Sequence, residues 1–143
     1  MAKILGVCTS EKKGVQKVNV GKIELVENHG LKGDAHAGDW HRQVSLLSWE
    51  KIEDFKNRGG KVKDGDFGEN LIVQGIDLAK LPVGTKLKIN EIELEVTQIG
   101  KECHQHCAIY HAVGDCIMPR EGIFARVLSG GIVQINDEIN IVE

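Results

Sequence analysis

The sequence predicts a mostly β, barrel-like fold with a few short helices, and three observations lead to this prediction. The 143-residue chain contains 17 glycines spread along its length, and they separate short segments rich in Val, Ile and Leu. Apolar and polar residues alternate within several of these segments, as they do in a strand with one buried face. Clear helical spacing is confined to one segment. Many short strands with few helices are typical of a barrel or a sandwich.

The predicted strands follow one another along the whole chain. They are AKILGVCTS (2–10), KIELVEN (22–28), RQVSLLS (42–48), ENLIVQG (69–75), TKLKIN (85–90), EIELEVTQIG (91–100), FARVLSG (124–130) and DEINIVE (137–143). The stretch KLKINEIELEV predicts a hairpin that turns at Asn90 and Glu91. Alternation is clearest at two sets of apolar positions, Ile92, Leu94 and Val96, and Ile135, Ile139 and Val142.

The segment SWEKIEDFKNRGG, residues 48–60, predicts a short amphipathic helix. Ser48 is placed as its N-cap, acidic residues occupy its opening turns, and basic residues precede a glycine stop. Its apolar positions are Trp49, Ile52 and Phe55. A second helical turn is predicted in AIYHAV (108–113), whereas PREGIFARV (119–127) suits a helix or a strand equally well.

Length and composition indicate a single domain over residues 1–143. The chain is long enough to bury about two-thirds of its unfolded surface. Its net charge of −3 gives no electrostatic footprint for nucleic acid. Its apolar runs are far shorter than the ~20 residues that cross a bilayer, and its start lacks the pattern of a secretory signal. We therefore expect a cytoplasmic protein without nucleic-acid or membrane partners.

The stretch GKECHQHCAIYHAVGDC, residues 100–116, holds three of the four cysteines and three of the six histidines. Cys103 and Cys107 have a spacing found in structural zinc sites, but a second ligand pair would have to come from His111 and Cys116. An iron–sulfur cluster would need Cys8 as well, although its apolar neighbours predict a buried structural thiol.

Two further interpretations of this stretch stay open. Its histidines can be solvated loop residues and its thiols small fillers. Alternatively, one cysteine is reactive, because the stretch follows a predicted strand at Gly100, where functional loops are commonly mounted. Lys101, His104 and His106 would then lower the pKa of a nearby thiol and favour the thiolate.

Three other stretches carry candidate ligand-binding residues. In residues 29–48, glycines bend the chain between Asp34, His36, Asp39 and His41; ordinary turn chemistry is favoured over a metal or acid–base site. In residues 64–75, Asp66, Glu69 and Asn70 can cap a turn or accept bonds from a ligand. Near the C-terminus, Arg120 and Arg126 stand among apolar residues and are expected to face an anion, or a salt bridge to Glu121 or Glu102. Additional anion-binding candidates are Lys32, Arg42 and Lys101.

Four blocks of the sequence, in order, resemble the MOSC family, named for the C-terminal domain of molybdenum cofactor sulfurases. They are GLKGDAHAGDWHRQVSLLS, FGENLIVQGIDLAKLPVGTKLKI, LEVTQIGKECHQHC and GIFARVLSGGIVQINDEI. The family implies a mostly β, barrel-like fold. It includes stand-alone bacterial proteins, cofactor-binding sulfurase domains, and molybdoenzymes that reduce N-hydroxylated compounds.

The resemblance implies that the protein binds the molybdenum cofactor, molybdopterin. By position, Cys107 looks like the family's molybdenum ligand or sulfur-transfer site, with Cys103 as a second candidate; His104, His106 and Cys116 depart from the simpler family loop. A soft thiolate suits molybdenum, and the pterin phosphate needs cations and backbone donors. The expected cofactor-binding residues are Lys32, Gly33, Asp34, His36, Arg42, Glu69, Asn70, Arg120 and Arg126.

The leading hypothesis is therefore a carrier or sulfur-handling module in molybdenum cofactor metabolism. Its partners would be cofactor biosynthesis proteins or molybdoenzymes. No PLP is expected, because the desulfurase domain of the larger sulfurases does not fit within this length. The alternatives are a small molybdenum-dependent reductase of N-hydroxylated compounds that takes electrons from a separate donor, and a zinc-stabilised structural domain.

Overall fold

The computed structural model of the protein describes residues 2–12, 15–100 and 121–142. Within them lie strands, one α-helix and one 3₁₀-helix. In chain order these are β1 (Lys3–Thr9), β2 (Val18–Asn19), β3 (Lys22–Val26), β4 (Gly30–Leu31), β5 (Val44–Ser48), α1 (Trp49–Asn57), β6 (Leu71–Gln74), η1 (Leu78–Lys80), β7 (Lys86–Ile89), β8 (Ile92–Ile99), β9 (Ile123–Ser129), β10 (Gly131–Gln134) and β11 (Asn140–Val142).

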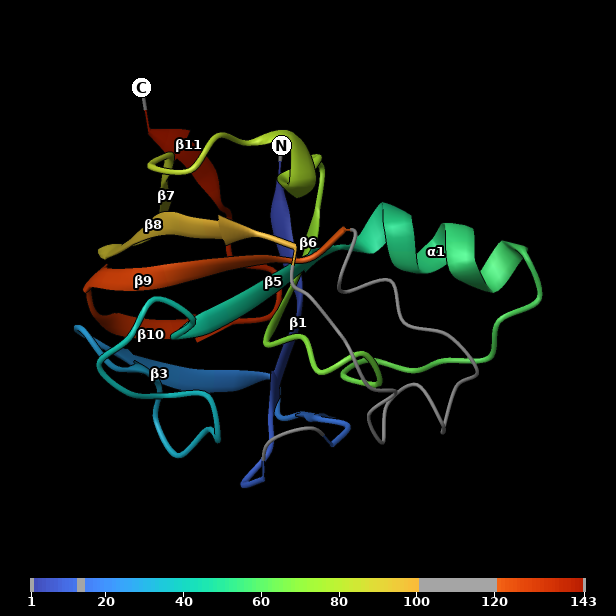
Figure 1. The fold of residues 1–143 in the computed structure, drawn as a ribbon, viewed down its shortest axis with the longest axis horizontal. Helices are drawn as coiled ribbons and strands as arrows, with labels where there is room; N and C mark the ends of the chain where they lie inside the picture. The colour runs from blue at the N-terminus through green and yellow to red at the C-terminus, as the bar shows by residue number, and fades with distance from the viewer. Residues whose placement is uncertain (1, 13–14, 101–120, 143) are drawn as a thin grey trace.

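The strands form two sheets that curl around a common core (Figure 1). The larger sheet has eight strands in the order β11-β7-β8-β9-β5-β6-β1-β2, and the smaller has three in the order β10-β3-β4. Neighbours are antiparallel except for β5 and β6, which are parallel and are connected through α1. This curled, half-barrel arrangement confirms the predicted mostly β, barrel-like fold.

The inner face of the curled sheet carries the main apolar core. It includes Leu94 and Val96 from β8 and Ile123, Ala125 and Val127 from β9, each at most 1% exposed. The predicted alternation at Ile92, Leu94 and Val96 is confirmed, since all three are buried and their neighbours are not. Burial of these side chains stabilises the fold by about 25 cal/mol for each Å² of apolar surface removed from water.

A second, smaller apolar cluster lies on the outer face of the same sheet. It joins Cys8, Leu47, Ile72 and Phe124 on the strands to Ile52 and Phe55 of α1. In Figure 1 the helix projects sideways beside β5 and β6. Cys8 is fully buried, as predicted for a structural thiol.

Several local predictions are confirmed and others are wrong. The hairpin turn at Asn90 and Glu91 and the helix that begins after Ser48 are confirmed. Ser48 makes no side-chain cap, because its hydroxyl donates to the carbonyl of Ile76 and accepts from the N–H of Leu78. The ambiguous segment 119–127 forms strand β9 from Ile123 onward. The predicted turn at 108–113 lies outside the described residues.

The C-terminal prediction is only partly right. Strand β11 begins at Asn140, and all three of its residues are exposed. Ile139 is buried just before the strand, whereas Val142 is 41% exposed, because β11 is an edge strand that pairs with β7 alone. The strands that the sequence did not predict, β2, β4 and β10, are only two to four residues long. None of the helices in the described part of the chain could span a membrane.

Candidate functional site

A tight turn after strand β4 places Asp34 inside the protein. The N–H of Asp34 donates to the carbonyl of Leu31 at 3.0 Å, and Gly33 at the third position of this turn has φ +82°. A type II turn requires this left-handed conformation, which glycine adopts without strain. A side chain at Gly33 would meet nothing within 4 Å. Gly33 is therefore required for backbone conformation rather than for packing.

Asp34 forms a buried ion pair with Lys17. Lys17 Nζ lies 2.8 Å from Asp34 Oδ1, and neither side chain is exposed to solvent. The same oxygen accepts bonds from the hydroxyl of Thr9 and the N–H of Ser10, and Oδ2 accepts from the N–H of His36. Burial alone would raise the pKa of Asp34, but the hydrogen bond and charge of Lys17 and the two backbone donors lower it below its usual value.

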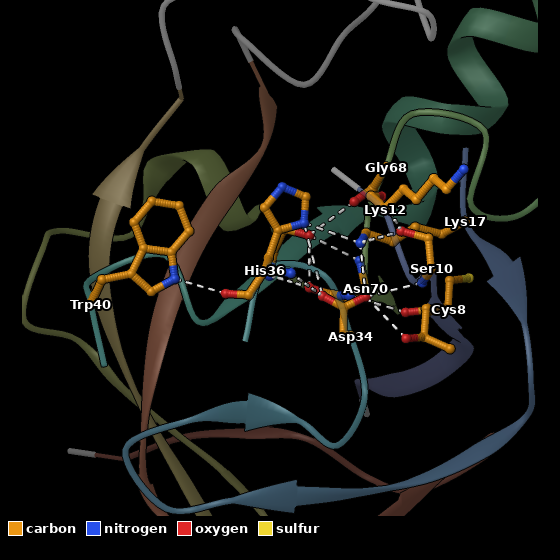
Figure 2. Close-up of polar contacts among 11 residues, drawn as sticks. Cys8, Ser10, Lys12, Lys17, Asp34, His36, Trp40, Gly68 and Asn70 are labelled. Atoms are coloured by element: carbon orange, nitrogen blue, oxygen red, sulfur yellow. Dashed lines mark hydrogen bonds and ion pairs between the residues drawn. The ribbon is translucent and has the colours of Figure 1, made fainter. Parts of the chain in front are cut away.

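His36 lies directly beside this ion pair. Its Nδ1 is 3.1 Å from Lys17 Nζ, and its carbonyl accepts a 2.7 Å hydrogen bond from the indole N–H of Trp40. The imidazole is partly exposed, at 24%. Figure 2 shows His36 between Trp40 on one side and Lys17 on the other, with Asp34 beneath the ring. We call Thr9, Ser10, Lys17, Asp34 and His36 the lysine cluster.

The loop before strand β6 buries two further polar side chains, Glu69 and Asn70. Glu69 accepts bonds from the N–H groups of Gly65 and Phe67, each at 3.0 Å. Burial raises its pKa to about 7, although these backbone donors oppose the shift. Asn70 connects β5 to β1, since it accepts from the N–H of Ser45 and donates to the carbonyl of Cys8. Glu69 and Asn70, both predicted to contact a ligand, are thus fully buried, and their side chains form hydrogen bonds within the protein.

Cys8 is a poor candidate for sulfur chemistry in its own right. Burial, reinforced by the negative charge of Glu69 and other nearby carboxylates, raises the pKa of its thiol far above the usual value. Because the thiolate is the nucleophile and the metal ligand, such a thiol is inert. Among the described residues, no set of three His, Cys, Asp or Glu side chains could hold a metal ion.

An irregularity in strand β8 positions a second group of polar residues. The pairing with β9 shifts between Val96 and Gln98, so Thr97 is an extra residue that donates to the carbonyls of His41 and Phe124. The shift brings Gln98 opposite Phe124. Gln98 Oε1 then lies 3.0 Å from His41 Nε2 and accepts a 3.1 Å bond from Arg42 Nε. Bulges often redirect side chains in this way next to functional sites.

Arg42 is packed against aromatic rings on the outer face of the sheet. Its guanidinium carbon is 5.2 Å from the ring centre of Phe124 and 6.0 Å from that of Trp40. Contacts of this length are cation–π interactions. Trp40 also donates its indole N–H to the carbonyl of His36, so Trp40 connects Arg42 to the lysine cluster.

Arg126 lies on the same face of β9 as Phe124. Side chains alternate along a strand, and Ile123, Ala125 and Val127 point into the main core. Arg126 Nε is buried and has no hydrogen-bond partner among the described residues. Among the described residues, no salt bridge joins Arg126 to Glu121, which pairs with Lys51 at 3.6 Å; Arg120 and Glu102 lie outside the described residues. We call Arg42, Gln98, Phe124 and Arg126 the arginine cluster.

The structure brings together most, but not all, of the predicted ligand-binding residues that it describes. Gly33, Asp34 and His36 meet in the first cluster, and Arg42 and Arg126 flank Phe124 in the second. Lys32 is separate: its side chain is 73% exposed and lies 3.9 Å from Glu24 on the smaller sheet. Cys103, Cys107 and Arg120 lie outside the described residues. Their neighbours along the chain, Gly100 and Gly122, are joined by a 2.7 Å backbone hydrogen bond.

Sequence reasoning missed Thr9, Ser10, Lys17, Gln98 and Phe124 of the two clusters, and also Trp40 beside them. Lys17 stands in the apolar stretch VQKVNV, and a lone lysine among valines is a weak signal of burial. Trp40 lies in the stretch of residues 29–48, where the Asp and His residues are the stronger ligand candidates. Gln98 had no sequence signal, since its position depends on the irregularity at Thr97.

Comparisons with known proteins agree with this architecture. The profile of the MOSC domain matches residues 32–140. The solved structure of the YuaD protein from Bacillus subtilis is similar with a TM-score of 0.78 at 21% identity, covering 97% of this chain and 94% of that chain. YiiM from Geobacillus stearothermophilus gives 0.74 at 17% identity, covering 100% and 76%.

YiiM from Escherichia coli gives a TM-score of 0.69 at 18% identity, covering 100% of this chain and 70% of that chain. None of the curated proteins matches the sequence. At these identities the solved structures show the fold alone. The profile match, however, covers well over half of the sequence, and the protein therefore belongs to the MOSC domain family.

Proposed function

We propose that this protein binds a molybdopterin-type cofactor on the surface formed by the two clusters, and that it acts as a carrier or sulfur-handling module in molybdenum cofactor metabolism. MOSC domains are linked to the molybdenum cofactor in general. The observation that carries the proposal for this chain is Arg126 Nε, a buried donor without a partner among the described residues. Buried polar groups are nearly always hydrogen-bonded, so such a donor indicates a missing acceptor.

The residues of the arginine cluster fit the chemistry of this cofactor. Molybdopterin combines a flat, polar pterin with a phosphate. Arg42 and Arg126 supply two guanidinium groups for the phosphate, and Phe124 and Trp40 supply apolar surface near them. Arg42 keeps donors beyond the one that Gln98 occupies. When bound, the molybdenum would supply oxygen-atom or sulfur transfer at its dithiolene centre.

Cys107 is the proposed molybdenum ligand or persulfide site, with Cys103 as the second thiol. Both lie outside the described residues, so the support comes from the sequence and from the residues that flank them. The backbone bond between Gly100 and Gly122 fixes the two ends of residues 101–121 side by side. Gly100 and Gly122 lie two positions along the chain from Gln98 and Phe124 of the arginine cluster. A soft thiolate suits molybdenum.

Metal and pterin analysis of the purified protein tests this proposal. The protein would be isolated from a molybdenum-replete host as wild type, Cys107→Ala and Cys103→Ala. We expect pterin and molybdenum with the wild type, and loss of molybdenum from Cys107→Ala. If neither copurifies, and none binds after incubation with free cofactor, the proposal is wrong. Stoichiometric zinc, with a loss of thermal stability on chelation, would instead support a zinc-stabilised domain.

A further inference from the structure

The side-chain amide of Gln98 has its orientation fixed by the groups at its two ends. Gln98 Nε2 donates to the carbonyl of Gly100 at 2.8 Å, and Gln98 Oε1 accepts from Arg42 Nε at 3.1 Å. A carbonyl can only accept a hydrogen bond, and an arginine Nε–H can only donate one. The reversed amide would break both bonds, so Gln98 presents its oxygen, and not its nitrogen, to Arg42.

The same oxygen of Gln98 determines which nitrogen of His41 carries a proton. His41 Nε2 lies 3.0 Å from Gln98 Oε1. Since this oxygen can only accept, His41 Nε2 is the donor. Gln98 therefore holds two consecutive side chains, His41 and Arg42, through one shared acceptor.

The bond to Gln98 leaves one edge of the Arg42 guanidinium for a ligand. A guanidinium binds an oxyanion through two parallel N–H groups, either Nε with one terminal nitrogen or both terminal nitrogens. Gln98 occupies Nε, whereas the terminal nitrogens of Arg42 form no hydrogen bond within residues 2–12, 15–100 and 121–142. The guanidinium carbon lies 5.2 Å from the ring centre of Phe124, so this ring covers one face. The edge formed by the terminal nitrogens is therefore the one that an oxyanion can approach.

Gln98 also leaves the positive charge of Arg42 uncompensated. In the described part of the chain Arg42 forms no ion pair with a carboxylate, and the group that holds its Nε is a neutral amide. A glutamate at position 98 would accept the same hydrogen bond, but it would add a negative charge and could not donate to Gly100. The amide orients Arg42 without neutralising it.

We propose that Gln98 is a positioning residue that orients Arg42 and keeps its charge available, so that the two terminal nitrogens of Arg42 bind two oxygens of one phosphate group. An arginine that is held in place before binding loses less conformational entropy when the ligand arrives. The choice of ligand, the phosphate of a pterin cofactor, rests on the proposed function; the orientation of Arg42 by Gln98 does not.

Nitrogen NMR of the arginine side chains tests this orientation without any ligand. In the wild type at pH 7 we expect a resolved Arg42 Nε–H signal that exchanges with water more slowly than in free arginine. Gln98→Met, which removes the acceptor, should abolish this protection, whereas Gln98→Glu, which keeps an acceptor oxygen, should retain it. An unprotected Arg42 Nε–H in the wild type, or unchanged protection in folded Gln98→Met, would overturn the proposal. The wild-type measurement is decisive even if no Gln98 variant folds.

The affinity for isolated molybdopterin tests the importance of the charge. We expect Gln98→Glu to raise the Kd at least tenfold, because its carboxylate competes with the phosphate for Arg42. Gln98→Met should raise the Kd about fivefold, because Arg42 must then be ordered on binding. Gln134→Glu adds the same charge at an exposed position of strand β10 and is the matched control, which should bind like the wild type. Equal Kd values for Gln98→Glu and Gln134→Glu would refute the role of the neutral amide.

Two further comparisons show whether Gln98 acts through Arg42 on a phosphate. In an Arg42→Met background, Gln98→Met should raise the Kd no further, and the pterin without its phosphate should bind wild type and Gln98→Glu equally. A full additional loss in the double variant, or an equal loss for the phosphate-free pterin, would contradict the proposal. If the wild type does not bind molybdopterin at all, the proposed function and the phosphate role fail, while the NMR result still decides whether Gln98 orients Arg42.

Discussion

The lysine cluster and the arginine cluster both contain cations, but the cations of the two clusters have different partners. Lys17 is fully buried, faces a carboxylate and uses all three of its donors. Arg126 has a buried Nε without a partner among the described residues, and Arg42 Nε donates to the neutral amide of Gln98. A buried cation that pairs with a carboxylate of the protein, such as Lys17, stabilises the fold. A cation without such a partner among the described residues, such as Arg126, can bind an anionic ligand.

The largest effect expected from this difference is a loss of stability in Lys17→Met. Removing the lysine leaves the Asp34 carboxylate buried without its counter-charge, which typically costs about 3–5 kcal/mol. Chemical denaturation, followed by circular dichroism, measures the free energy of unfolding. Lys12→Met is the control with an exposed lysine. A loss of less than about 1 kcal/mol in Lys17→Met would mean that the ion pair does not support the fold.

A second variant separates the charge from the packing. In Lys17→Met/Asp34→Leu both charges are gone, so we expect the double variant to recover most of the roughly 3–5 kcal/mol lost in Lys17→Met, because replacing a whole buried pair by apolar residues is often neutral. If the double variant is less stable than the single one, lost hydrogen bonds to Asp34 matter more than its uncompensated charge.

The next effect is a pH dependence from Glu69. Its folded pKa of about 7 exceeds its ordinary value of 4.5, so the folded state binds more protons, and stability falls as the pH rises between those values. The full shift corresponds to on the order of 3 kcal/mol. Comparing the free energy of unfolding of wild type and Glu69→Gln at pH 5 and pH 8 measures this term, since the variant lacks the titrating group.

Asp34 acts in the opposite direction and at lower pH. Its folded pKa lies below the ordinary 3.8, so its stabilisation is present above that value and is lost as the pH falls through the folded pKa. At pH 5 and above, the contribution of Asp34 to stability is therefore constant, and the measured pH dependence excludes it. The account of Glu69 fails if wild type and variant lose stability in parallel between pH 5 and pH 8.

The smallest stability effect is expected for Arg126→Met. The variant keeps most of the apolar stem and removes a buried donor that has no partner among the described residues, so we expect a change within about 0.5 kcal/mol of wild type. The measurement is the same denaturation experiment. A loss as large as that of Lys17→Met would erase the distinction between the two clusters.

Much of the fold could be predicted from the sequence because it depends on local patterns. The period of two at Ile92, Leu94 and Val96 predicts a half-buried strand directly, and the spacing of Ile52 and Phe55 predicts the helix. The exposure of the edge strand β11 was harder to predict. Its short apolar sequence is also typical of a buried strand, and only the order of strands in the sheet shows that it lies at the edge.

The candidate site was less predictable because its contacts join distant parts of the chain. Lys17 and Asp34 are 17 positions apart, and no sequence pattern pairs them. A turn rich in Asp, His and Gly is ordinary on its own. Gln98 meets Arg42 only because the pairing of β8 shifts at Thr97. The glycine turn at Gly33 was visible in the sequence, but the burial of Asp34 behind it was not.

The affinity of molybdopterin for Arg126→Met tests the central claim most directly. The matched control is Arg58→Met, which removes an arginine whose side chain is 59% exposed. We predict that Arg126→Met raises the Kd of isolated molybdopterin at least tenfold, as for loss of a charge-assisted hydrogen bond, while Arg58→Met binds like the wild type. Equal Kd values for all three proteins would contradict the assignment of the arginine cluster as the cofactor site.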